Sequence, residues 1–482
     1  MSTLSRLEPA LVWRRFAELT AIPRPPKEEA AARAYVLEWA KRRGFESAVD
    51  SEGNVVVRVP ATPGREAAAT VVLQAHLDMV CERDPGSEYD PRAGRIRIVV
   101  EDDWVVAPET TLGADDGIGV AAAMAAAEDA TASHGPLELL FTVCEEAGLD
   151  GAKALEPSFV SGRVLLNLDG TSDRSLTIGC AGSAHTFARV PLRPEPVPAG
   201  VVMLRITLTG GRGGHSGADI DKGRANAIKA LGHVLARAFE ETPVRLARLD
   251  GGVSRNAIPR DAAGLVAVED ETSFRKAAVR ELAAFRDQFS GSDGGLSLSI
   301  EPAAGAERAA DHETTRRLLD LVAATPSGVL AMSPSLPGRV ETSSCLTTAS
   351  TEDGVVTFSS MTRSSSAPAL DGVVASVAAA ARLAGAEIEV LRSYPPWRPN
   401  LESPLLATAR ATYERLFDAT PLLDVVHGGL ECAVIGDRLP GIDMLSLGPE
   451  IVGMHAPGER LNIPATQRFY RLLGALLDDL SR

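Results

Sequence analysis

Several short apolar segments in this chain end directly at histidine or acidic residues, and this pattern constrains the fold more than any other feature. The expected strands and the polar residues after them are 70–74 with His76, 137–144 with Glu145 and Glu146, and 164–168 with Asp169. Short apolar runs bounded by polar residues are typical of buried strands. Helix patterns alternate with these runs, which predicts an α/β fold with a mixed, mostly parallel sheet flanked by helices.

Two proline-rich segments, 191–200 and 393–397, divide the chain. Between them the pattern changes to that of an α+β domain. The expected strands there are 202–209, 264–269 and 296–302, and the expected helices are 225–242, 274–289 and 309–324. After the second proline-rich segment, a helix at 405–417 and a strand at 444–447 return to the first pattern. We therefore expect a catalytic domain formed by 1–186 and 394–482, with a second domain inserted at 187–393.

The composition argues against several classes of function. The 482 residues include 64 acidic and 49 basic ones, giving a net charge of −15, so we expect no nucleic-acid partner. The longest apolar stretch, 117–127, is too short to span a bilayer, and the charged N-terminal segment 1–26 is unlike a signal peptide. Five cysteines without a CxxC spacing indicate reduced thiols. These features predict a cytoplasmic enzyme with no membrane partner.

Acidic and histidine residues near the ends of the expected strands form a candidate metal site. The set comprises His76, Asp78, Asp115, Glu145, Glu146, Asp169 and His455. In open α/β sheets, ligands bind at the carboxyl edge of the strands, so several strand ends would direct oxygen and imidazole ligands to one place. Two histidines and three carboxylates are enough for two divalent ions that share a bridging carboxylate, and zinc accepts this mixture of ligands.

Neighbouring members of this set are suited to different roles. Asp78 comes two residues after His76, on the same side of an extended chain, where a carboxylate can orient the imidazole. Glu145 and Glu146 cannot both point the same way from an extended strand, so one can bind metal while the other acts as a general base. Asp115 lies in a glycine-flanked turn before a helix, a position suited to bridging.

Each residue taken alone also has a structural interpretation. Asp116 fits a helix N-cap, and Asp169 fits a cap at the end of a strand. Adjacent glutamates commonly lie on a solvated face, although this pair directly follows an apolar run. Together, in one α/β frame, the residues favour a metal site.

Seven segments of the sequence, in this order, resemble one known family. They include 74–80 (QAHLDMV), 111–119 (TLGADDGIG), 141–152, 179–182, 213–217 (GGHSG), 255–260 and 427–432 (HGGLEC). With these motifs the whole chain resembles the dinuclear-zinc peptidases and deacylases, a family that includes carboxypeptidase G-like enzymes and acylases, and within it the dipeptidases.

The resemblance implies a role for each candidate residue. The implied metal ligands are His76, Asp115, Glu146, Asp169 and His455, with Asp115 bridging two zinc ions, or manganese or cobalt in their place. Asp78 is implied as the orienting acid, and Glu145 as the general base for a bridging water. The inserted domain is implied to be a lid that forms a homodimer. The implied substrate-binding residues are His215, Asn256 and Arg363, and His427 is expected to line the pocket, as is Glu431.

The expected function is hydrolysis of the peptide bond of short peptides, Xaa-His and other dipeptides included. Asp116, where the dipeptidases usually have asparagine, and Gly170, where they usually have serine, depart from the family pattern. Neither change removes a ligand, but both bear on the choice of metal and substrate. Two alternatives are a deacylase of N-acyl amino acids on the same dinuclear site and a metal-binding but inactive regulatory relative. For Arg363 a surface salt bridge, and for His215 an incidental position in a glycine-rich hairpin, are the structural alternatives.

Overall fold

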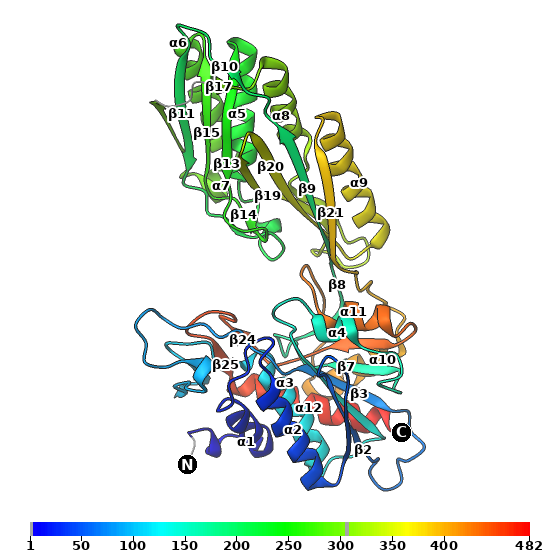
Figure 1. Cartoon of the computed structure of the whole chain (residues 1–482). Helices are drawn as coiled ribbons and strands as arrows, with labels where there is room; N and C mark the ends of the chain where they lie inside the picture. Colours follow the sequence, from blue (N-terminus) through cyan, green and yellow to red (C-terminus); the bar gives the residue numbers. More distant parts are fainter. Residues whose placement is uncertain (1–2, 304–307) are drawn as a thin grey trace. The chain divides into compact units, whose positions relative to one another are not determined.

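A computed structural model of the chain describes residues 3–303 and 308–482 (Figure 1). The chain forms two compact units: unit 1 is Met1–Gly179, Trp397–Val425 and Leu430–Arg482, and unit 2 is Cys180–Pro396 and Val426–Gly429. The predicted segments 1–186 and 187–393 include residues 1–2 and 304–307, which lie outside the described residues. Within the described ranges, no helix is both long and apolar enough to cross a membrane.

Unit 1 is built on an eight-stranded sheet with the order β1-β2-β6-β3-β7-β23-β8-β22. The strands are β1 (Glu46–Val49), β2 (Val55–Val59), β3 (Val71–His76), β6 (Leu137–Thr142), β7 (Val164–Asn167), β8 (Ser175–Cys180), β22 (Leu422–Val426) and β23 (Asp443–Ser446). The central strands β6, β3, β7 and β23 are parallel, whereas β1–β2, β2–β6 and β23–β8 are antiparallel pairs. The predicted mixed α/β sheet with a parallel centre is confirmed.

The central strands of unit 1 are apolar along their length because helices cover them. Every residue of β3 and β6 is buried, as expected for parallel strands inside an α/β sheet. Helix α3 packs against β3 and α1, α10 and α11 pack against β23, and α10 also packs against α12. The helices are α1 (Ala10–Leu19), α2 (Ala30–Arg43), α3 (Ala114–Glu128), α4 (Asp150–Ala154), α10 (Pro404–Phe417), α11 (Glu431–Arg438) and α12 (Ile463–Leu480).

A smaller sheet of unit 1 has the order β24-β25-β5-β4. Its strands are β4 (Val99–Glu101), β5 (Trp104–Val106), β24 (Ile451–Val452) and β25 (Arg460–Asn462). The connection between β24 and β25 contains His455. Antiparallel pairing of β25 with β5 fixes the C-terminal end of that connection.

Unit 2 contains an antiparallel sheet with the order β16-β11-β15-β13-β19-β20-β9-β21, and β18 pairs with β19. The strands are β9 (Gly182–Pro191), β11 (Val202–Thr209), β13 (Val244–Gly251), β15 (Ala262–Val268), β16 (Ser297–Pro302), β18 (Gly328–Met332), β19 (Val340–Glu352), β20 (Val355–Ser364) and β21 (Glu387–Tyr394). The helices that pack on it are α5 (Ala227–Glu241), α6 (Glu271–Gln288), α8 (His312–Ala324) and α9 (Ala367–Leu383). A short pair, β12 (Gly214–His215) with β14 (Ala257–Ile258), lies outside this sheet.

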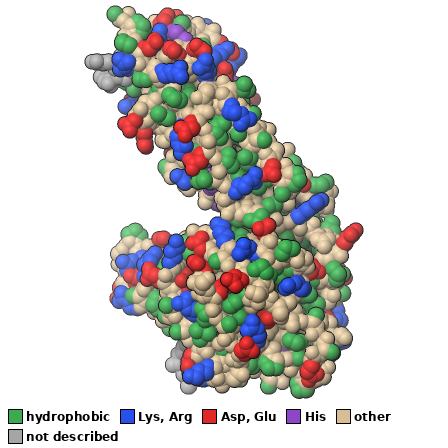
Figure 2. Space-filling model, turned by 45° about the vertical axis from the view of Figure 1, so that its right-hand side comes forward, with side chains coloured by type: hydrophobic (Ala, Val, Ile, Leu, Met, Phe, Trp, Pro, Cys, Tyr) green, Lys and Arg blue, Asp and Glu red, His purple; other side chains and the backbone are tan. Residues whose placement is uncertain are grey.

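Most predicted elements differ from the observed ones by a few residues at their ends, as for the predicted strand 137–144, which ends at Thr142. Two of the differences have a clear local cause. The helix predicted at 309–324 begins at His312, because Asp311 caps it by accepting the Thr314 N–H, while Ala309 belongs to a short strand. The glycine-flanked turn predicted to contain Asp115 is already part of helix α3, which begins at Ala114, although Asp115 and Asp116 have non-helical backbone angles. On the face drawn in Figure 2, acidic and basic side chains are interspersed with apolar ones.

Candidate metal centre

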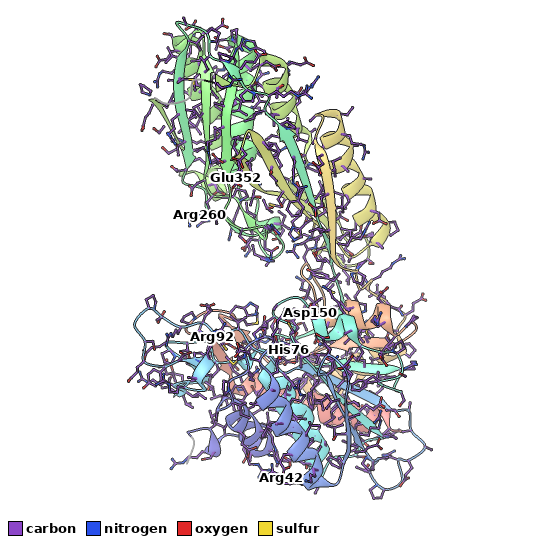
Figure 3. The ribbon with its side chains drawn as sticks, viewed as in Figure 1. Arg42, His76, Arg92, Asp150, Arg260 and Glu352 are labelled. Carbon is purple, nitrogen blue, oxygen red and sulfur yellow. The ribbon has the colours of Figure 1, made fainter. Side chains whose placement is uncertain are left out.

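Three neighbouring parallel strands of unit 1 bring four of the predicted residues to one edge of the sheet. His76, which is labelled in Figure 3, is the last residue of β3. Asp169 follows the end of β7 by two residues, and the pair Glu145 and Glu146 lies in a turn just after β6. Because β6, β3 and β7 are adjacent and parallel, their carboxyl ends lie side by side. This edge is where open α/β sheets bind ligands.

Asp115 lies between two imidazoles. Its Oδ1 is 3.0 Å from Nε2 of His76, and its Oδ2 is 3.1 Å from Nε2 of His455. Nε2 of His455 is also 3.0 Å from Oε2 of Glu146, and Oδ1 of Asp169 is 3.9 Å from Nε2 of His76. The Asp115 carboxylate therefore joins two groups of candidate ligands, one on each of its oxygens.

Asp78 connects the imidazole of His76 to the glutamate pair. Nδ1 of His76 is 3.1 Å from the backbone oxygen of Asp78. Because a carbonyl oxygen only accepts, Nδ1 holds the proton and Nε2 is left to bind a ligand. The two carboxylate oxygens of Asp78 accept the backbone N–H groups of Glu145 and Glu146, each at 3.0 Å. One buried residue thus orients an imidazole through its backbone oxygen, and its carboxylate fixes the turn that contains both glutamates.

The turn before Asp115 is bound by a buried carboxylate that the sequence analysis did not identify. Glu459 is 2% exposed, and its oxygens accept four consecutive backbone N–H groups, those of residues 112–115, at 2.8–3.3 Å. Burial raises the pKa of the Glu459 carboxyl, and the N–H groups of Gly113 and Leu112 oppose that rise. The only sequence signal for this residue is its position four residues after His455.

A fully buried arginine binds the other side of the same turn. Arg24 donates to the backbone oxygens of Gly113, Leu77 and Asp78 at 2.6, 3.0 and 2.8 Å. Gly113 has φ of 71°, and a Cβ at this position would lie 2.6 Å from Nη2 of Arg24, so only glycine fits. Arg24 lies in the proline-rich connection between the first two helices, and no local pattern marked it as functional.

The centre concentrates buried negative charge. Burial raises the pKa of Asp169 well above its usual range, and the nearby Asp115 carboxylate raises it further. Burial likewise raises the pKa of Glu145, with His76 opposing and Glu146 adding to the rise. Burial would also raise the pKa of Asp115, but its hydrogen bonds with both imidazoles hold it below the usual range. Carboxylates buried this close together need compensating positive charge.

The donor atoms fit divalent cations. Three sets of side chains have ligand atoms within 4.8 Å of one another: His76 with Asp116 and Asp169, His76 with Glu145 and Glu146, and Asp115 with Glu146 and His455. Oε1 of Glu146 is buried and has no hydrogen-bond partner among the described residues. Imidazole nitrogens and carboxylate oxygens without thiolates suit zinc and similar divalent metals.

The two departures from the family pattern have local structural causes. Asp116 Oδ1 accepts the N–H of Gly119, the i to i+3 bond of a helix cap, and its Oδ2 accepts the N–H of His76. Both carboxylate oxygens of Asp116 therefore accept a backbone N–H, whereas asparagine would have an amide nitrogen in place of one of them. Gly170 lies against the backbone after β23, where a Cβ would be 2.5 Å from the nitrogen of Gly448. A larger residue would therefore need that backbone to move.

Glu431 is fully buried in unit 1 and lies within a polar network. Its Oε2 accepts from Nε2 of Gln74 at 2.5 Å and from Oγ1 of Thr142 at 2.6 Å. Oε1 of Gln74 accepts in turn from Nδ2 of Asn167. Burial raises the pKa of Glu431 to about 7. Through Gln74, the network holds β3 two residues before His76, a predicted metal ligand.

Three of the predicted substrate-binding residues lie together in unit 2, around Gly217. A Cβ on Gly217 would clash with the backbone oxygen of His427, and would lie 3.1 Å from Nε of Arg363 and 3.2 Å from Cε1 of His215. Arg363 is 3% exposed, its Nη1 donates to the Tyr394 hydroxyl at 3.2 Å, and its Nε is buried without a partner among the described residues. Glycine is therefore the residue that allows this close approach.

Both imidazoles of this cluster are held neutral. Nδ1 of His215 accepts the N–H groups of Gly217 and Ala218 at 3.2 and 3.0 Å, so the proton lies on Nε2. Burial and the Arg363 guanidinium lower the pKa of His215. The same two causes lower the pKa of His427 to about 4, and its Nε2 is 2.7 Å from Oγ of Ser343. Arg363 is therefore the positive charge of the cluster.

The fourth predicted residue, Asn256, is joined to the cluster through its backbone. Its backbone oxygen accepts the N–H of Ser216 at 2.7 Å, next to the β12–β14 pair in which His215 faces Ala257. The Asn256 side chain is exposed. The structure thus brings all four predicted residues into one part of unit 2.

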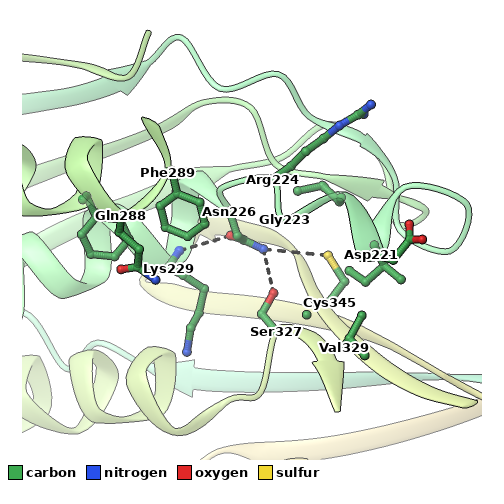
Figure 4. A pocket seen from close by; sticks show the side chains of 14 residues that line it. Asp221, Gly223, Arg224, Asn226, Lys229, Gln288, Phe289, Ser327, Val329 and Cys345 are labelled. Atoms are coloured by element: carbon green, nitrogen blue, oxygen red, sulfur yellow. Dashed lines mark hydrogen bonds between the residues drawn. The ribbon is translucent and has the colours of Figure 1, made fainter. Parts of the chain in front are cut away.

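A separate cavity of about 440 Å³ lies in unit 2 between α5, α6 and β18. Figure 4 shows Asn226 on its wall, where its Nδ2 donates to Oγ of Ser327 at 3.2 Å and to the backbone oxygen of Leu346 at 2.7 Å. Nζ of Lys229 donates to three carbonyl oxygens at the end of α8. Phe285 and Phe289 are among the apolar residues that line it. The side chains of Asn226 and Lys229 are thus bound within the protein.

Known proteins are similar to this chain in fold and in sequence. Residues 72–479 match the model of peptidase family M20/M25/M40, and the chain belongs to that family. The family resemblance predicted from the sequence is thereby confirmed, as is an enzyme of the metallopeptidase class that uses divalent metal ions.

Individual relatives narrow the comparison. The chain is 38% identical to the cytosol non-specific dipeptidase of Escherichia coli (strain K12), over all of this chain and 99% of that protein. The crystal structure of aminoacylhistidine dipeptidase from Vibrio alginolyticus superposes with a TM-score of 0.91 at 36% identity, covering 99% of this chain and 98% of that one. Aminopeptidase PepT from Bacillus cereus, at 18% identity and a TM-score of 0.59 over 99% of this chain and 100% of that one, shares the fold.

Proposed function

We propose that this chain is a dipeptidase with two divalent metal ions, which hydrolyses Xaa-His and other dipeptides. The observation that carries this proposal is the position of Asp115, whose two oxygens each lie about 3 Å from a different imidazole, those of His76 and His455. Asp169 beside the first imidazole and Glu146 beside the second complete two groups of ligands. The names of the two similar dipeptidases support the substrate class.

The proposed metal is zinc, with manganese or cobalt as the alternatives. His76, Asp115 and Asp169 hold one ion, and Asp115, Glu146 and His455 hold the other. Two bound divalent ions supply the Lewis acidity that activates a water molecule and polarises a peptide carbonyl.

Glu145 is the proposed general base. Its carboxylate accepts a proton from the attacking water and gives it to the leaving amine. Burial and the neighbouring Glu146 carboxylate raise the pKa of Glu145, which suits a group that must both accept and donate a proton. Asp78 keeps Glu145 in place by accepting its backbone N–H, and keeps the His76 proton on Nδ1.

The proposed substrate-binding residues belong to unit 2. The guanidinium of Arg363, with its unpartnered Nε, binds the terminal carboxylate of the dipeptide. His215 donates from Nε2 to the oxygen of the reacting carbonyl, because its Nδ1 already accepts two N–H groups. Asn256 and His427 complete the binding residues.

Several wider features belong to the same proposal. Unit 2 acts as a lid and as the contact of a homodimer, in keeping with the resemblance. The enzyme is cytoplasmic, as the name of its E. coli relative states for that protein, and has neither nucleic-acid nor membrane partners.

The proposal is tested by release of free amino acids from a panel of dipeptides. The panel contains several Xaa-His members and an N-acyl amino acid, each measured with added zinc and after chelation. We expect chelator-sensitive cleavage of dipeptides and none of the N-acyl compound. Cleavage of the N-acyl compound alone would assign the chain to the deacylases. Absence of turnover on every compound, with two metals bound, would favour the inactive relative.

A further inference from the structure

We propose that Glu459 is a positioning residue of the metal centre and acts by holding the turn that presents Asp115. Glu459 has no direct contact with the imidazoles or with Glu146 among its described hydrogen bonds; it contacts backbone N–H groups. The inference rests on the proposed metal centre, because it explains how the bridging carboxylate is placed.

The contacts of Glu459 cover the whole turn. Oε2 accepts the N–H groups of Leu112 and Gly113 at 2.8 and 3.0 Å, and Oε1 accepts those of Ala114 and Asp115 at 2.8 and 3.3 Å. The last of these donors is the backbone of the bridging residue itself. A shift of the Glu459 carboxylate would therefore move the Asp115 side chain relative to both imidazoles.

Only a carboxylate satisfies this turn. Four N–H groups require two oxygens with two free lone pairs each, and the turn is buried, so an N–H left without a partner would destabilise it. Glutamine would keep one oxygen and present its NH₂ group to two donors. The carbonyl oxygen of Gly113 already accepts from Arg24, so the backbone of the turn is bound on both sides.

Glu459 also links two ligand positions of the centre through one short segment. His455 lies four residues before Glu459. The segment 455–459 therefore supplies one imidazole and also holds Asp115, the carboxylate that faces this imidazole. The segment is itself attached next to β5: the N–H of Gly458 donates to the backbone oxygen of Ala107 at 3.0 Å, and the N–H of Ala107 donates to that of Glu459 at 3.1 Å. The distance between Asp115 and His455 is therefore determined by the contacts of this one segment.

Unit 1 contains a matched control for a purely structural role. Glu138 is 3% exposed, and its Oε2 accepts the backbone N–H groups of Ser161 and Gly162 at 2.8 and 2.9 Å. It is the second residue of β6, whose opposite end leads to the glutamate pair. Glu138 thus resembles Glu459 in its burial and in accepting backbone N–H groups, at the other end of a strand from the metal ligands. Its Oε1 differs, because it accepts from Oγ of Ser161 at 3.0 Å and lies 3.7 Å from Nε of Arg58.

The test compares E459Q, E459D and E138Q with the wild-type protein. Zinc affinity is measured by competition with a chromophoric chelator, and amide hydrogen exchange of residues 110–118 is measured in the metal-free proteins. We expect E459Q to bind zinc about 10- to 100-fold more weakly and E459D to lose less, since supporting partners of metal ligands contribute this much. We expect the turn amides to exchange faster in E459Q, and E138Q to match the wild type in both measurements.

A second comparison uses Asp115 itself. If Glu459 acts through Asp115, E459Q added to D115A weakens the remaining zinc binding by less than about twofold. An undiminished loss in that background would overturn the inference, as would unchanged zinc affinity in E459Q, equal exchange of the turn, or an equal loss in E138Q. A wild-type protein that binds no zinc would contradict the proposed function, whereas the exchange experiment would still decide whether Glu459 holds the turn.

Discussion

The two units of this protein bring together side chains of opposite charge type, acidic in unit 1 and basic in unit 2, and they do so with different elements of structure. In unit 1, carboxylates gather at the carboxyl edge of parallel strands, and backbone N–H groups and one buried arginine hold them there. In unit 2, an arginine lies beside two histidines in an antiparallel unit, and a glycine lets them approach one another. The first cluster attracts cations. The second has one fixed positive charge and two neutral imidazoles.

The difference shows how each cluster uses burial. Burial pushes the acidic groups of unit 1 toward protonation, so a bound cation is what keeps several of them ionised together. Burial pushes the histidines of unit 2 toward their neutral forms, and Arg363 acts in the same direction. The proposed metal site and the proposed carboxylate-binding site therefore both depend on burial, applied to residues of opposite charge type.

The largest expected effect concerns the base of the acidic cluster. We expect E145Q to lower kcat about 10³-fold or more while zinc content stays at the wild-type level, because a general base contributes about 10²–10⁴-fold. Turnover and zinc per chain are measured on the same preparation, with E156Q, a substitution of an exposed glutamate, as the control. Full activity in E145Q would remove the base from the proposed mechanism.

The next effect tests whether the histidines of unit 2 are neutral. His427 has its pKa lowered to about 4, so the folded state disfavours its protonated form. Stability is then complete above about pH 6.5, the ordinary histidine value, and falls as pH decreases toward 4, by at most about 3 kcal/mol. We expect H427Q to lose this part of the pH dependence.

The measurement is denaturant unfolding of metal-free wild type and H427Q at pH 7 and pH 4.5. Lowering the pH from 7 to 4.5 should reduce the free energy of unfolding more in the wild type than in H427Q. The difference between the two proteins should therefore change between pH 7 and pH 4.5. The control is H312Q, a substitution of a histidine on the surface of α8. Parallel pH profiles for wild type and H427Q would show that the fold does not lower the pKa of His427.

A third effect tests the positive charge of unit 2. We expect R363M to lower kcat/KM about 30-fold for dipeptides with a free terminal carboxylate, since a charge-assisted hydrogen bond contributes about 1.5–3 kcal/mol. The same dipeptides with an amidated C-terminus should be affected far less. Thermal unfolding checks that the variant is folded. An equal loss on both substrate series would mean that Arg363 serves structure alone.

The smallest expected effect concerns Gly217, around which His215, Arg363 and His427 lie close together. We expect G217A to destabilise the protein by about 1–3 kcal/mol, because its Cβ would overlap the backbone oxygen of His427. The matched change G372A, in helix α9 with open space around the site, should stabilise by about 0.5–1 kcal/mol. Opposite signs in thermal unfolding are the expected result, and two changes of the same sign would contradict it.

The parts of the site that the sequence predicted are those tied to a periodic pattern. His76 and Asp169 lie at the carboxyl ends of apolar strands. Because these strands are parallel, both residues are expected at the same edge of the sheet. In unit 2, strand β11 was likewise predicted from alternation, and helix α5 from its amphipathic pattern. The metal-ligand and substrate roles came from the family motifs, and they remain predictions.

Other parts had no such pattern. Arg24 and Glu459 act on backbone groups distant in sequence, and a lone charged residue carries no sign of its burial. Strand β19 was not predicted either, because it is rich in serine and threonine although most of it is buried. Its polar side chains can be buried because they find hydrogen-bond partners, such as the pair Thr342 and Ser364. Such pairing depends on tertiary contacts.

The division of the chain has a consequence for how such proteins can recombine. Unit 2 consists of one long segment and the four residues Val426–Gly429, so the polypeptide passes between the units four times. A gene exchange with crossovers near Cys180 and Pro396 would transfer His215 and Arg363 from the donor but leave His427 from the host. The Gly217 contact would then join residues of two ancestries, and only donors with a compatible glycine-rich segment would give a working hybrid.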